Sequence, residues 1–105
     1  MAGPRNPSTL SWRHDGKNTD GSAFDATRFG GWELDVNGTG MLSVPLGWET
    51  DGEYQAPIAE LNLPEGDYSL RLRLVTNEDI PSAYSAPVAF EIRKVPNGPL
   101  DFSVA

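Results

Sequence analysis

The segment from Leu61 to Leu74 constrains the fold more than any other part of this chain. It joins a short apolar stretch to the turn Pro64-Glu65-Gly66 and then to a regularly alternating run with apolar residues at Tyr68, Leu70, Leu72 and Leu74. Successive side chains of a β-strand point to opposite faces, so this run predicts one buried and one solvated face. A strand of that kind is typical of an antiparallel sheet that packs on a core with one side only.

The rest of the chain consists of short apolar segments separated by turns, and no segment has helical periodicity. The dipeptide Asn37-Gly38 is a strong hairpin signal, and Pro45 indicates that the segment before it is an edge strand. We predict loops over 15–30 and 47–57, and strands or strand ends over 7–14, 32–36, 41–46, 58–63, 68–74 and 88–92. Trp12, Trp32 and Tyr68 occupy alternating apolar positions, so we assign them to the core. The pattern predicts an all-β protein, an antiparallel two-sheet sandwich.

Length and composition limit the class of protein. The chain has 105 residues, enough for one domain, which we place at 1–95 with a C-terminal tail over 96–105. It has no cysteine, which excludes disulfides and thiolate metal sites, and its net charge of −7 argues against nucleic acid and anionic membranes as partners. The residues after Met1 form no apolar signal segment, so we expect synthesis in the cytoplasm without a signal peptide.

The residues that could carry chemistry do not form a recognisable catalytic motif. His14 is the only histidine, and no serine lies on a nucleophile-elbow motif, so we predict no enzymatic activity and no cofactor. The loop after His14 resembles a calcium loop only superficially, because aligning Gly21 with the invariant glycine puts Gly16 where the first aspartate should be. We predict no metal site, although an irregular calcium site built from Asp15, Asp20 and Asp25 stays open as an alternative to ordinary turn chemistry.

Four aromatic residues in the two predicted loops are candidates for partner contact: Phe24, Phe29, Trp48 and Tyr54. Tryptophan and tyrosine are enriched in protein interfaces. Beside the carboxylates of Glu49, Asp51 and Glu53, such rings can also stack on sugars. A third possibility is that they fold back and cover one end of the sandwich.

Several segments together resemble a fibronectin type III domain over residues 7–95. Leu10-Ser11-Trp12 is similar to the second strand of that family, Trp32-Glu33-Leu34-Asp35-Val36 to the third, and Ser82 to Val88 to the approach to the last strand. The turn before Tyr68 makes this residue similar to the corner tyrosine, and the resemblance implies that its hydroxyl group caps the backbone of that turn. Among the family and its immunoglobulin-like relatives, the chain most resembles the small stand-alone proteins of tailed bacteriophages, which implies a location in the virion.

A missing first strand and a surplus last one suggest a specific hypothesis. Residues 1–6 hardly supply a first strand, whereas Leu100, Phe102 and Val104 resume the alternation after the last one. The tail would then complete the vacant first-strand position, in its own domain or in a neighbouring subunit. It could instead be a frayed terminus or the beginning of a further domain.

These observations predict a non-enzymatic structural module that binds other protein subunits. We expect a small phage virion or assembly protein whose partners are copies of itself or other virion components. The alternative is a glycan-binding or adhesion module at a cell or virion surface. A third option is an accessory domain of a larger hydrolase.

Overall fold

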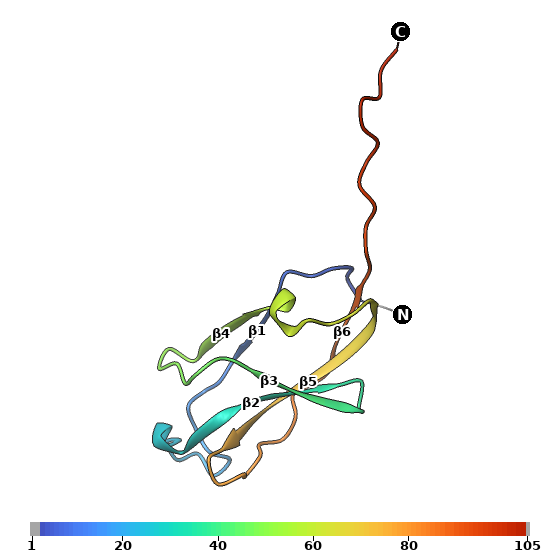
Figure 1. Cartoon of the computed structure of the whole chain (residues 1–105). Coiled ribbons are helices and arrows are strands. Elements are labelled where there is room, and N and C mark those ends of the chain that lie inside the picture. Colours follow the sequence, from blue (N-terminus) through green and yellow to red (C-terminus); the bar gives the residue numbers. More distant parts are fainter. Residues whose placement is uncertain (1–2, 105) are drawn as a thin grey trace.

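The computed structural model describes residues 3–104, which form two antiparallel sheets and almost no helix (Figure 1). The strands are β1 (Thr9–Arg13), β2 (Phe29–Val36), β3 (Gly40–Val44), β4 (Glu53–Pro57), β5 (Gly66–Thr76) and β6 (Val88–Ile92). Two short 3-10 helices, η1 (Ala26–Arg28) and η2 (Ile58–Leu61), lie between them. One sheet has the order β3-β2-β5-β6, and the other consists of β1 and β4. The predicted all-β class is confirmed.

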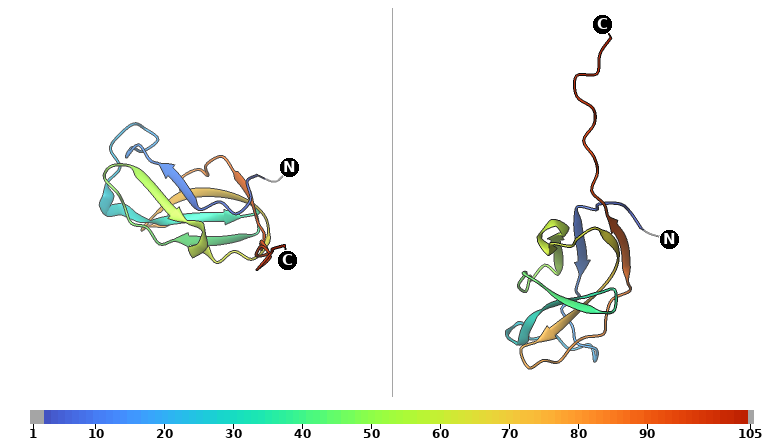
Figure 2. Two further views of the ribbon diagram at one scale, coloured as in Figure 1. Left: turned by 90° about the horizontal axis from the view of Figure 1, so that it is seen from above. Right: turned by 45° about the vertical axis from the view of Figure 1, so that its right-hand side comes forward.

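The apolar faces of the two sheets pack against each other (Figure 2). The ring of Trp32 on β2 lies 5.6 Å from that of Trp12 on β1 and 4.8 Å from that of Tyr54 on β4. Leu70, in the middle of β5, is 1% exposed, the lowest value among the buried apolar residues. Trp32 and Tyr68 are also buried, while Trp12 is half-buried against the same core, as the alternation predicts.

The outer face of the larger sheet carries charged side chains, which agrees with the alternation of β5. Arg71 lies opposite Asp35 in the register of β2 and β5, and Arg73 lies opposite Glu33. Both pairs form ion pairs at 3.0 Å. Tyr84 covers the two guanidinium groups, which lie 4.4 and 4.9 Å from its ring centre. The basic side chains of this sheet are therefore engaged within the chain.

Two turns have the form that the sequence predicts. Asn37 and Gly38, between β2 and β3, both have positive φ angles, 54° and 74°, as the tightest class of hairpin turn requires. Strand β3 lies at the edge of its sheet. The hydroxyl group of Tyr68 donates a hydrogen bond to the carbonyl oxygen of Pro64, so this tyrosine caps the turn before β5.

The segment before that turn differs from the prediction. Residues 53–57 form strand β4 and not a loop, and residues 58–61 form a 3-10 helix and not a strand end. Tyr54, Ala56 and Ile58 are all buried, but the small size of Ala56 and the presence of Pro57 weaken the strand signal. Asn62 then adopts a left-handed backbone with φ 54°, which ends η2.

The two ends of the described chain behave differently. Residues 4–6 run along β6, where the backbone N–H of Asn6 donates to the carbonyl oxygen of Glu91 at 2.8 Å and the N–H of Glu91 donates to Pro4 at 3.0 Å. The C-terminal tail projects away from both sheets (Figure 1), and the longest dimension is 72 Å. Among residues 3–104 the tail pairs with no strand of its own domain.

Gly30 is required where β2 approaches β5 most closely. A β-carbon added there would lie 2.6 Å from the backbone carbon and oxygen of Thr76, beside the irregular register between Phe29 and Gly31. We expect Gly30→Ala to lower the free energy of unfolding by about 2 kcal/mol, because backbone atoms have to move. Urea denaturation measures this. Gly31→Ala is the matched control, since nothing lies within 4 Å of its added carbon. Equal effects of both substitutions would contradict the close approach.

Candidate interaction surfaces

An aromatic cluster closes one end of the molecule, and it contains the four predicted contact residues. Trp48 lies at the centre of this cluster, with ring distances of 5.0 Å to Phe24, 5.9 Å to Phe29 and 5.2 Å to His14. Phe24, Phe29 and Trp48 are all partly buried against the core. Their rings contact one another, so the cluster covers the ends of the sheets.

Tyr54 is buried, and its prediction as an exposed loop residue was wrong. It lies on β4, is 3% exposed and stacks on Trp12 with ring centres 5.5 Å apart. Its hydroxyl oxygen accepts a hydrogen bond from the backbone N–H of Glu49 at 2.9 Å and lies 3.3 Å from the carbonyl oxygen of the same residue. Tyr54 therefore fixes the loop before β4 and has almost no surface to offer a partner.

His14 belongs to the same cluster and has a structural environment. Its ring lies 6.0 Å from that of Trp32, and its Nδ1 accepts a hydrogen bond from the backbone N–H of Gly16 at 2.9 Å. The imidazole therefore packs against aromatic rings on one side and accepts a hydrogen bond from the loop that follows β1. No serine nucleophile and orienting carboxylate are arranged around its Nε2 in the manner of a catalytic triad among the hydrogen bonds of residues 3–104.

The aspartates of the long loop act in turns and not as a joint metal site. Two hydrogen bonds from Thr27, first from its hydroxyl group and then from its backbone N–H, hold the pKa of Asp25 below the ordinary value. Ser22 lowers the pKa of Asp20 in the same way. Asp15 accepts from the backbone N–H of Lys17 at 3.0 Å. Within residues 3–104 no three metal-binding side chains come together, so the hypothesis of an irregular calcium site has no support.

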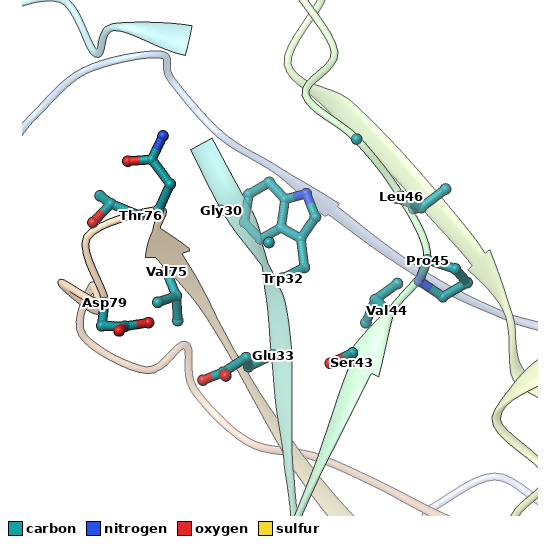
Figure 3. A pocket seen from close by; sticks show the side chains of 13 residues that line it. Gly30, Trp32, Glu33, Ser43, Val44, Pro45, Leu46, Val75, Thr76 and Asp79 are labelled. Carbon is teal, nitrogen blue, oxygen red and sulfur yellow. The ribbon is translucent and has the colours of Figure 1, made fainter. Parts of the chain in front are cut away.

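A hollow of about 550 Å³ lies where β2, β3 and the end of β5 meet (Figure 3). The carboxylates of Glu33 and Asp79 border it, together with Ser43 and the backbone of the two glycines of β2. Arg73 already engages Glu33 at 3.0 Å. Ser43 and Thr76 bring hydroxyl groups to the lining, which contains no histidine.

The C-terminal tail presents apolar side chains to solvent. Leu100, Phe102 and Val104 are 87%, 93% and 99% exposed. No hydrogen bond ties residues 95–104 to the two sheets within the described part of the chain. These three predicted contact residues therefore keep the exposure that contact with a partner requires.

An apolar groove, here called the β1 groove, runs beside the free edge of β1. It has a volume of about 230 Å³ and is lined by Leu10, Trp12, Leu70, Leu72, Ala86 and Val88 among others. Val88 faces inward from β6, in register with the buried Leu70, and yet is 48% exposed. The sequence predicts Trp12 as a core residue, but it does not reveal that Leu10, Trp12 and Val88 share an uncovered flank. The short segment before β1 was the only signal of this groove.

Comparison with known proteins does not identify the chain. No family model, curated protein or solved structure matches it. The described residues include no helix of the length and hydropathy that crossing a membrane requires.

Proposed function

We propose that this chain is a non-enzymatic structural module, a fibronectin type III-like sandwich that binds other protein subunits. The observation that carries the proposal is the C-terminal tail, whose three alternating apolar side chains are 87% to 99% exposed. Exposed apolar surface of this kind marks a contact site, because leaving it in water is unfavourable. Its alternation matches one face of a strand, and strands bind by adding to a sheet edge.

The role that we favour is that of a small assembly protein, of the kind found in phage virions. Such a protein has to hold its neighbours in place and needs no catalytic residues. The acidic surface, with a net charge of −7, keeps free copies apart until a specific contact forms. The glycan-binding alternative depends on exposed aromatic rings beside carboxylates, and the burial of Tyr54 removes one of the two rings on which it was based.

Truncation of the tail tests the proposal. The ten buried apolar residues all lie between Trp32 and Phe90, so a chain ending at Lys94 retains the whole core. We expect light scattering to find oligomers of the full chain at high protein concentration and monomers of the truncated chain. The melting temperature should be unchanged within about 2 °C, because the tail contributes no buried surface. A full chain that stays monomeric, alone and at every concentration, would contradict self-assembly.

A further inference from the structure

We propose that residues 99–104 of one copy add as a strand to the free edge of β1 in a second copy and fill its β1 groove. This inference rests on the proposed function and names the binding site and the partner for it. Each copy has one tail and one groove, so the contact is head-to-tail and builds rings or filaments.

The backbone of β1 is open on one side. The N–H of His14 donates to Gly52 at 2.9 Å, and the N–H of Ile58 donates to Ser8 at 3.0 Å, in register with the β1–β4 pairing. In an antiparallel pair, hydrogen-bonded and non-hydrogen-bonded positions alternate. The backbone N–H and C=O groups of Thr9, Ser11 and Arg13 therefore point away from β4. No residue between 3 and 104 forms a hydrogen bond with these groups.

Apolar side chains beside this edge are also left partly exposed to solvent. Leu10 and Trp12 point from β1 toward the core but are only partly buried, and Val88 across the groove is 48% exposed. A second hollow, of about 210 Å³ and lined by both polar and apolar residues, lies past the end of β1 at His14 and Leu74. A strand placed beside β1 would cover the β1 groove with every second side chain.

The tail has the length and pattern of such a strand. Six residues span roughly 20 Å when extended, slightly more than the five residues of β1. Leu100, Phe102 and Val104 would face the groove, while Asp101 and Ser103 would face solvent. In an antiparallel register with Phe102 on Trp12, Asp101 lies opposite Arg13 and Ser103 lies opposite Ser11. Arg13 has no ion-pair partner within the described residues, so this register supplies one.

The path of the chain favours a second copy over the same copy. Figures 1 and 2 show that β6 ends at the end of the molecule where β1 begins, so a tail folding back on its own domain would run parallel to β1. The N–H groups of Arg93 and Lys94 are held by Asn6 and Glu65. Only the tail of another copy can approach β1 in the antiparallel direction without releasing these contacts.

Disulfide trapping tests the proposal, and the natural chain has no cysteine that would interfere. In the full chain carrying Ser11→Cys and Ser103→Cys, we expect mild oxidation to give a ladder of covalent oligomers that collapses on reduction. Mixing two singly substituted chains, one of them tagged, should give a covalent heterodimer. The control pair, Ser43→Cys with Ser103→Cys, places the first cysteine on the exposed edge strand β3 and should give no ladder.

Each other outcome overturns the inference. A double-cysteine chain that closes on itself as a monomer would place the tail in its own groove. A ladder from the Ser43→Cys pair would move the site to β3. Association in light scattering without disulfide coupling in the Ser11→Cys pair would refute the β1 groove and leave the proposed function standing. If the unsubstituted full chain is monomeric at every concentration, self-assembly and the inference fail together.

Discussion

Leu70→Ala should lower the free energy of unfolding by about 3 kcal/mol, as expected for a leucine at the centre of a core. Leu70 is 1% exposed and lies in register with Val36 on β2 and Val88 on β6, so the deleted atoms leave a cavity that neighbouring strands cannot close. Domains of this size are stable by about 5 to 15 kcal/mol, so such a loss would unfold a sizeable fraction of molecules under mild urea. The midpoint of urea denaturation measures the effect.

Leu72→Ala is the matched control for this experiment. Leu72 is the next inward-facing residue of β5, but it borders the β1 groove and is only partly buried. Leu72→Ala should lower the free energy of unfolding by about half as much as Leu70→Ala, because truncating a side chain already in contact with water removes less buried apolar surface. Equal losses at the two positions would mean that the flank beside β1 is as well covered as the centre of the core. The uncovered groove would then be wrong as a description of the molecule in solution.

The strands with the plainest alternation were predictable from the sequence. Tyr68, Leu70 and Leu74 on β5 and Trp32 and Leu34 on β2 are buried, because an uninterrupted period of two leaves only one face for the core. The same argument correctly placed Arg71 and Arg73 on the outer face, where each meets a carboxylate on β2. Local pattern sufficed wherever the buried residues were large and the intervening ones were charged.

Strand β4 and the ends of the chain could not be predicted in this way. Ala56 is small and Pro57 is rare inside strands, so the strand signal around Tyr54 is weak, and the pairing with β1, far away in the sequence, decides the structure there. The pairing of residues 4–6 with β6 is equally non-local. For the candidate site, the apolar tail was visible in the sequence. The groove was indicated only by the missing first strand, and its lining could not be predicted because it depends on which neighbour β1 lacks.

Phe102→Ser should weaken self-association roughly thirtyfold, because burying a phenylalanine side chain contributes about 2 kcal/mol. The side chain is 93% exposed in the single chain, so its replacement should leave the free energy of unfolding of the monomer unchanged. Sedimentation equilibrium across a concentration series measures the first quantity, and urea denaturation of dilute protein measures the second. Ser103→Ala is the control, since this side chain would face solvent on the added strand. A loss of monomer stability in Phe102→Ser would instead show that the tail packs on its own domain. Equal weakening of self-association by Phe102→Ser and Ser103→Ala would show that the contact does not bury alternate side chains of the tail. Only a strand that buries every second residue predicts all three results: weaker association and unchanged monomer stability in Phe102→Ser, and unchanged association in Ser103→Ala.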